Sequence, residues 1–220
     1  ALRKCAEAIE LAESLLAKHP DFPEAIELRR QLVLCYDMTA DEDGRQHALN
    51  AYLAEAEKHG GSEAWVLAIV GEAARYGRAQ QDLRAVQCYD RLLARFPKGR
   101  FAAIAHRGIA PYVPYEQREQ QYRLALSEGD WEVRSRLSIN TELIMMNINR
   151  SRCRVALEDI DRMAEEAKTE HERAIAESLR GLALVQIGKD ARALAHLRTV
   201  VQDYAPEHTS LARTHLRQLE

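Results

Sequence analysis

The sequence has few residues that interrupt helices, and it has no long apolar run. Its 220 residues include ten glycines, six prolines and 6% aromatic side chains. No stretch approaches the roughly 18 consecutive apolar residues that a membrane-spanning helix needs, so we expect no direct insertion into a membrane. Basic residues (31) nearly balance acidic residues (34), and the net charge is −3. This balance gives no overall attraction to nucleic acid, so we expect no nucleic-acid partner.

The short motifs that accompany catalysis or cofactor binding are also missing. The sequence contains no glycine-rich loop for nucleotide phosphates and no G-x-S-x-G turn for a nucleophilic serine. None of its eight histidines belongs to an H-E-x-x-H zinc motif. We therefore expect that the chain is not an enzyme and has no cofactor and no metal site.

Four cysteines are present, and none forms the C-x-x-C pair of zinc or redox sites. Cys5 and Cys35 lie equally far from Pro20, one before it and one after it. If the chain folds back there, the two sulfurs lie at similar heights on adjacent antiparallel helices. They are then either two small buried apolar side chains, which we favour, or a disulfide that implies an oxidising compartment.

Proline and glycine punctuate the chain in short polar clusters. The segments between them are rich in strong helix formers such as Ala, Leu, Glu, Arg and Gln, and β-branched residues are sparse. Apolar residues recur at three- and four-residue spacing, whereas the period-two alternation of strands is absent. The sequence therefore predicts an all-α protein. The expected helices cover about 2–18, 23–37, 43–58, 62–76, 80–95, 100–110, 114–127, 130–147, 151–167, 170–187, 190–204 and 206–219.

Several helix starts carry their own signals. Ser62, Asp130 and Asp190 are the expected N-cap residues, because their side chains can accept a hydrogen bond from the first helical turn. Pro23 and Pro206 stand near first-turn positions, where a missing N–H has no consequence. Helices of this length joined by short loops fold back antiparallel on their neighbours.

A repeat runs through the chain. It is clearest at Ala85, Tyr89, Leu92 and Pro97, where a small residue is followed by a large one, another apolar residue and a helix breaker. Related copies are Ala8, Ala12, Leu15; Ala48, Tyr52; Ala156, Ile160, Met163; and Ala193, Leu197, Val200. Three of the four intervals between the first residues of these copies are nearly equal. The interval from Ala85 to Ala156 spans about two periods, so one copy is skipped there.

Glycines inside the alternate helices follow a similar period. Gly71 and Gly108 are one period apart, and Gly181 follows about two periods later. A glycine in a helix interior costs roughly 1 kcal/mol relative to alanine. Its periodic return predicts that a neighbouring helix approaches closely at each of these positions.

The pattern Ala-x3-Tyr-x2-Leu-x4-Pro resembles the second-helix signature of the tetratricopeptide repeat (TPR). Leu67, Val70, Gly71 and Ala74 resemble the first-helix pattern. The resemblance implies one TPR-like domain over 1–220, a right-handed α-solenoid of antiparallel helix pairs. Its phase gives half a repeat, five repeats and a terminal helix, as in a fragment of a longer protein. The match is poor over the middle of the chain, at 100–150.

In this family the first helices line the concave surface, so the resemblance implies a partner-binding groove there. Arg136 and Asn140 are one turn apart and can reach the same carboxylate or peptide carbonyl. Two tyrosines stand in the proline-stiffened turn Ala110–Tyr115, where they can present aromatic side chains to a partner. The candidate binding residues are Glu72, Arg75, Arg107, Tyr112, Tyr115, Arg136 and Asn140.

These observations favour a non-catalytic scaffold that binds a segment of another protein or peptide. The alternative is a ligand-binding or assembly module of a bacterial envelope machine that exports polysaccharide. PKGRFAAIAH at 97–106 is similar to envelope-associated bacterial repeats, and Tyr112 and Tyr115 could contact a sugar. The sequence leaves the compartment open between the bacterial cytoplasm and the periplasm or envelope.

Overall fold

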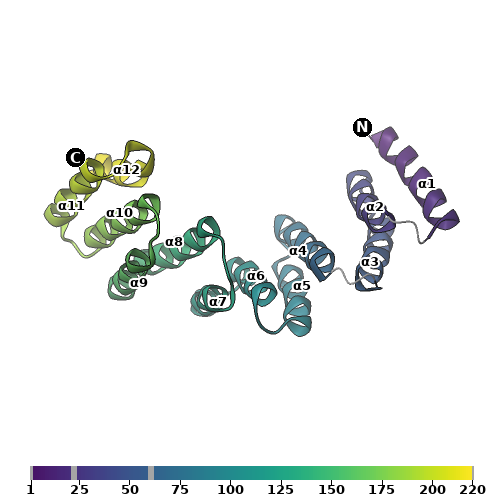
Figure 1. The fold of residues 1–220 in the computed structure, drawn as a ribbon, viewed down its shortest axis with the longest axis horizontal. Coiled ribbons are helices and arrows are strands. Elements are labelled where there is room, and N and C mark those ends of the chain that lie inside the picture. The colour runs from purple at the N-terminus through teal and green to yellow at the C-terminus, as the bar shows by residue number, and fades with distance from the viewer. Residues whose placement is uncertain (1, 21–23, 59–61, 220) are drawn as a thin grey trace. The chain divides into compact units, whose positions relative to one another are not determined.

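The computed structural model describes residues 2–20, 24–58 and 62–219, and all regular structure in these ranges is helical (Figure 1). The first five helices are α1 (Leu2–Lys18), α2 (Ala25–Thr39), α3 (Glu42–Lys58), α4 (Ser62–Arg78) and α5 (Asp82–Arg95). The others are α6 (Arg100–Ile109), α7 (Tyr115–Glu128), α8 (Val133–Asn149), α9 (Cys153–Glu166), α10 (Glu170–Gln186), α11 (Asp190–Asp203) and α12 (Ser210–Leu219). Two 3-10 turns, η1 (Ala110–Tyr112) and η2 (Pro206–His208), precede α7 and α12.

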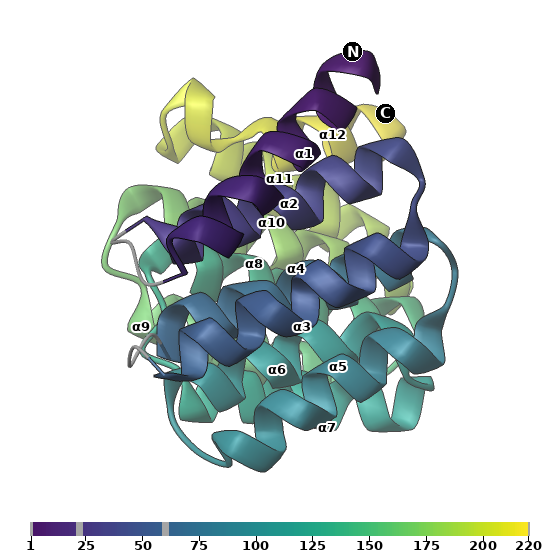
Figure 2. The same ribbon diagram turned by 90° about the vertical axis from the view of Figure 1, so that its right-hand side faces the viewer.

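Residue contacts divide the chain into two compact units, Ala1–Pro97 and Lys98–Glu220. In the first unit, α2 pairs with α3 and α4 pairs with α5, while α1 packs along α2 (Figure 2). In the second unit the pairs are α6 with α7, α8 with α9 and α10 with α11, and α12 packs on α10 and α11. Within the described ranges, the expected all-α repeat of one helix, five pairs and a final helix is confirmed. The prediction of a single domain over 1–220 stays a prediction.

The expected helix ends differ from the observed ones where proline intervenes. Pro111 and Pro206 each stand in the first turn of a 3-10 segment, so α6 ends at Ile109 and α12 begins only at Ser210. The N-cap prediction for Asp130 is wrong, because the chain stays extended until Glu132, which occupies the N-cap position of α8. Asp190 is instead the first residue of α11.

Two expected helix starts cannot be assigned in the same way. Ser62 is the first residue of α4, and the position before it lies outside the described residues. Pro23 also lies outside the described residues.

The clearest N-cap is one that sequence reading missed, a capping box at the start of α10. The Thr169 hydroxyl accepts a hydrogen bond from the Glu172 N–H at 3.2 Å. In return, Glu172 Oε2 accepts the N–H groups of Thr169 at 3.0 Å and Lys168 at 2.9 Å. These bonds satisfy backbone groups that have no partner within the helix. Burial alone would raise the pKa of the Glu172 carboxyl, but the two backbone donors lower it below its ordinary value.

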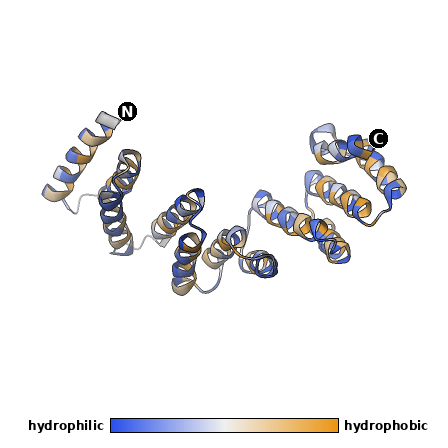
Figure 3. Cartoon of the chain, turned by 180° about the vertical axis from the view of Figure 1, so that it is seen from behind, coloured by the Kyte–Doolittle hydropathy of each residue, from blue (hydrophilic) through white to orange (hydrophobic). Residues whose placement is uncertain are grey.

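The repeat signature marks the buried face of the helices in which it is clearest. Ala85, Tyr89 and Leu92 of α5 are all buried, as are the corresponding residues of α9 and α11. Figure 3 shows apolar and polar residues alternating around the helices, as amphipathic packing requires. The signature fails in α1, where Ala8 and Leu15 are exposed.

The helix α1 instead buries Cys5, Ala12 and Leu16. Among the elements that the structure describes, α1 packs mainly against α2. A helix with one neighbour buries a narrower stripe than a helix packed from two sides. The sequence pattern alone did not show which face of α1 is buried against α2.

Two of the periodic glycines behave differently. A Cβ atom on Gly181 would lie 2.6 Å from Leu197 Cγ, which is closer than such atoms approach, so the predicted close contact is confirmed there. A Cβ atom on Gly71 would meet nothing within 4 Å, so the prediction is wrong at that position. Gly71 borders open space instead.

This difference predicts opposite effects for the same substitution. Gly181→Ala should destabilise the second unit by about 1–3 kcal/mol, because fully buried Leu197 must shift to admit the methyl group. Gly71→Ala should stabilise the first unit by roughly 1 kcal/mol, because alanine forms helix better and nothing opposes it. Urea unfolding followed by circular dichroism measures both, and equal shifts would contradict this packing.

The capping box predicts a pH dependence. The folded-state pKa of Glu172 lies below the ordinary value of 4.5, so its contribution to stability is complete above that pH. The contribution disappears as the pH falls through the folded-state pKa. Glu172→Gln should therefore lower the unfolding midpoint at pH 7, and its difference from the native chain should shrink toward pH 3. The exposed Glu165→Gln serves as control and should show no such convergence.

Candidate functional site

The candidate site is a hollow of about 480 Å³ in the first unit, which we call the α2–α4 groove. Helices α2 and α4 form its walls and α3 contributes its base. Its lining comprises Arg30, Val33, Leu34 and Asp37 from α2, Arg45, Leu49 and Tyr52 from α3, and Leu67, Ala68, Gly71, Glu72, Ala74, Arg75 and Arg78 from α4. In the second unit, by contrast, α8 packs on α10 and α10 packs on α12.

The walls of the groove present apolar side chains to solvent. Leu34 on α2 is 47% exposed and Leu67 on α4 is 65% exposed. Among the described residues, exposed large apolar side chains concentrate in the first unit: Leu11, Leu15, Leu34, Met38, Leu67 and Leu83, against Ile187 in the second. Because Gly71 has no side chain and open space in front of it, the α4 wall leaves room for a guest.

A buried ion pair contributes to the lining of the groove. Arg45 is 1% exposed and Glu72 is 6% exposed, and two hydrogen bonds of 2.6 and 2.9 Å join them. Glu42 accepts further hydrogen bonds from Arg45 at 3.0 Å and from Arg75 at 2.9 Å. Burial lowers the pKa of Arg45, but its bonds to Glu42 and Glu72 outweigh burial and raise it. Arg45 therefore stays charged, and it binds both oxygens of the Glu72 carboxylate.

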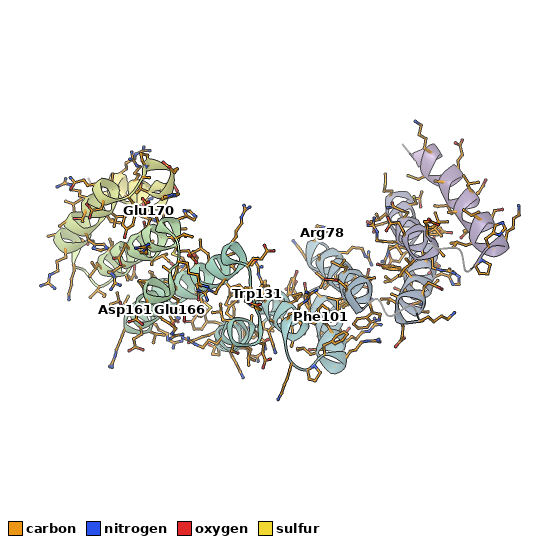
Figure 4. All side chains as sticks on the ribbon, in the orientation of Figure 1. Arg78, Phe101, Trp131, Asp161, Glu166 and Glu170 are labelled. Atoms are coloured by element: carbon orange, nitrogen blue, oxygen red, sulfur yellow. The ribbon has the colours of Figure 1, made fainter. Side chains whose placement is uncertain are left out.

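The remaining arginines of the groove differ in how far they are neutralised. Arg30 donates two hydrogen bonds to Glu27, at 2.8 and 2.6 Å. Arg75 binds Glu42, yet its Nε atom is buried without a hydrogen-bond partner. Arg78, the last residue of α4 and labelled in Figure 4, forms no ion pair with the part of the chain that the structure describes. Of these arginines, Arg78 therefore has its charge least compensated within the described residues.

The structure divides the seven sequence-predicted site residues between the two units. Glu72 and Arg75 lie together in the α2–α4 groove, Arg75 with its charge partly compensated. The other five belong to the second unit. Among them, the Arg107 guanidinium lies 5.7 Å from the ring centre of Trp131, and Arg136 pairs with Glu166 at 3.4 Å.

The two tyrosines of the turn also have different environments. The Tyr115 hydroxyl donates to Asn147 Oδ1 at 3.1 Å, and the Arg150 guanidinium covers its ring at 4.6 Å. Tyr112 and Asn140 are half-buried and make no hydrogen bond through their side chains within the described ranges. The hydroxyl and the ring of Tyr115 are therefore both engaged by other residues of the chain.

The proline-rich turn before α7 is held by a residue that sequence reading missed. Arg118 donates to the backbone carbonyls of Ala110 at 2.9 Å, Pro111 at 3.3 Å and Val113 at 3.2 Å. One guanidinium thus binds three carbonyl oxygens of the turn. Arg118 therefore stabilises the turn at which the repeat pattern is interrupted.

Leu34 and Leu67 are the functional candidates that sequence reading missed. Leu67 matches the first-helix pattern of the repeat, but α4 buries Trp65, Val66, Ile69 and Ala73 instead. The available signal was that Leu67, Gly71 and Ala74 recur at spacings of four and three, on a stripe other than that core face.

Comparisons with known proteins are sparse. No protein-family model matches the chain, and no curated protein matches its sequence. The crystal structure of a tetratricopeptide repeat protein from Parabacteroides merdae is similar, with a TM-score of 0.47 and 17% identity. The match covers 98% of this chain and 78% of that one. The helical-repeat fold described above rests on the helix pairs of this chain.

The described residues show neither a membrane span nor a metal site built from His, Cys, Asp or Glu. Within 2–20, 24–58 and 62–219, no helix combines the length and apolar character needed to cross a bilayer. No group of three His, Cys, Asp or Glu side chains in these ranges is placed to hold a metal ion.

The buried ion pair predicts strong non-additivity. Arg45→Ala should lower the free energy of unfolding by about 3–5 kcal/mol, because it leaves Glu72 buried without its partner. The double variant Arg45→Met, Glu72→Met should lose clearly less, since no unpaired charge remains. Urea unfolding of both variants tests this, and a double variant at least as unstable as Arg45→Ala would contradict it.

Proposed function

We propose that the chain is a non-catalytic interaction module, and that its α2–α4 groove binds a short segment of another protein. The segment offers one large apolar side chain with an acidic residue beside it. The observation that carries the proposal is the pair of exposed leucines, Leu34 and Leu67, on opposite walls of a hollow of about 480 Å³.

The apolar part of the proposal follows from exposed area. Leu34 and Leu67 lose contact with water when a partner side chain enters between them, and the gain is roughly 25 cal/mol per Å² of apolar surface buried. A groove between two helices suits an amphipathic helix or an extended segment whose anchoring side chain points inward. Gly71 sets the depth that this anchor can reach.

The acidic part follows from the charges of the lining. Glu72 and Glu42 compensate Arg45 and Arg75, whereas Arg78 has no such partner among the described residues. A carboxylate on the partner would therefore gain a charge-assisted hydrogen bond from Arg78. Asp37 stands on the α2 wall and would repel a carboxylate placed there. The acidic residue of the expected segment is therefore placed on the α4 side of the groove, beside Arg78.

The residues of the second unit belong to the proposal as further contacts. Asn140 and Tyr112 have side-chain groups without hydrogen bonds in the described structure, and Arg107 and Arg136 lie in α6 and α8 of the same unit. They would offer a longer partner polar contacts within that unit. The polysaccharide alternative has less support, because the hydroxyl and ring of Tyr115 are already engaged by Asn147 and Arg150.

A peptide selection followed by binding measurements tests the groove. Random peptides of a dozen residues, displayed on phage and selected on the full chain, should converge on a large apolar residue next to Asp or Glu. In fluorescence polarisation, Leu67→Ser should raise the Kd of the selected peptide at least about tenfold, which is a loss of about 1.4 kcal/mol of binding free energy. Gly71→Leu, which fills the groove, should do the same while the helical content is unchanged.

The matched control is Leu83→Ser. Leu83 is 72% exposed, close to the 65% of Leu67, but it lies outside the groove lining. Its substitution should change affinity less than about twofold. Peptides that bind Gly71→Leu as tightly as the native chain would place the binding site elsewhere.

A further inference from the structure

Three sulfur-bearing side chains meet where α1 packs on α2. The Cys5 Sγ atom lies 3.9 Å from Met38 Sδ. Cys35 stands three positions before Met38 on α2, so the two share one face of that helix. The Cys5 and Cys35 side chains are also in hydrogen-bond contact. Two thiols and one thioether thus form a single cluster.

The distance between the Cys5 and Met38 sulfurs suits two neighbouring ligands of a metal ion that is held by three sulfurs. Metal–thiolate bonds are about 2.3 Å long, so three sulfurs spread evenly around one ion lie about 4.0 Å apart. The observed separation of 3.9 Å between Cys5 and Met38 is close to this value. Both cysteines are free thiols.

The donor set decides which ion fits. Thiolate and thioether ligands are soft and select Cu(I), whereas zinc sites use four ligands drawn from thiolate, imidazole and carboxylate. Within the described ranges, no third His, Cys, Asp or Glu completes such a zinc set. We propose that Cys5, Cys35 and Met38 bind one Cu(I) ion between α1 and α2.

Solvent access and the helix dipole of α2 also favour a cation at this cluster. Cys5 is 8% exposed, but Met38 is 56% exposed, so the cluster opens to solvent on the Met38 side. Cys35 and Met38 lie in the last turns of α2, which ends at Thr39. The partial negative charge at the C-terminal end of a helix stabilises a cation.

Binding exchanges protons for metal with no change in oxidation state. Each thiol releases one proton to solvent, two Cu–S bonds form to the thiolates, and the third forms to the uncharged Met38 thioether. The resulting centre carries one negative charge. Oxidation of Cys5 and Cys35 to a disulfide would remove two ligands, so the reduced and oxidised chains should differ in copper binding.

The test is a competition titration on the full chain. The protein is reduced, freed of reductant under nitrogen, and shown to contain four free thiols with Ellman's reagent. Cu(I) is then added in the presence of the chelator bicinchoninate. One ion per chain should bind, and Cys5→Ser or Cys35→Ser should each weaken binding at least about 100-fold. Met38→Leu should weaken it about tenfold, because it removes the neutral ligand alone.

The matched control replaces the other two cysteines, Cys88→Ser and Cys153→Ser, and should leave affinity and stoichiometry unchanged. X-ray absorption of the native copper form should show three sulfur neighbours. Copper should also slow amide hydrogen exchange in α1, and this slowing should be absent in Cys5→Ser.

Four results would overturn the proposal. They are no binding against bicinchoninate, undiminished binding in Cys5→Ser, loss of binding in the Cys88 and Cys153 control, and a copper form without three sulfur neighbours. The absorption measurement uses the native chain, so it decides the question even if a cysteine variant fails to fold.

Discussion

A pair of antiparallel helices is too thin to bury its own apolar face, and this constraint organises the molecule. Each pair must present its apolar face to a neighbouring helix, and close contact requires small residues at the crossing points. Gly181 under Leu197 is the clearest case, because any side chain there would collide with a fully buried leucine. Buried alanines such as Ala85 and Ala156 serve the same purpose elsewhere. The short helix breakers between pairs follow from the need to turn back at once.

The first unit departs from this rule at the α2–α4 groove. There the base carries Arg45, a buried charge that is tolerated because Glu72 meets it with two hydrogen bonds. The walls keep Leu34 and Leu67 in solvent. A helix contact that would otherwise bury these leucines is replaced by an open hollow, and this difference carries the functional proposal.

Much of the fold was predictable because it follows from local sequence signals. The helix segments follow from propensity and punctuation, and the buried faces of α5, α9 and α11 follow from the Ala, Tyr and Leu spacing. The errors fall where tertiary contact decides. The stripe that α1 buries depends on its main neighbour, and the start of α8 depends on the extended backbone at Glu132 rather than on Asp130. The groove could not be predicted, because periodicity does not tell whether Leu67 meets a helix or water.

The missing side chain at Gly71 has a consequence for the proposed interaction, because it sets how deep an anchoring side chain can enter. Alanine at this position would make the groove shallower by one carbon atom, and leucine would make it shallower by several. A Cβ atom there would meet nothing within 4 Å. Homologous chains could therefore change which anchor they admit without rebuilding their core. In the proposed interaction, selectivity would be set at a position where a substitution does not disturb the packing of the protein.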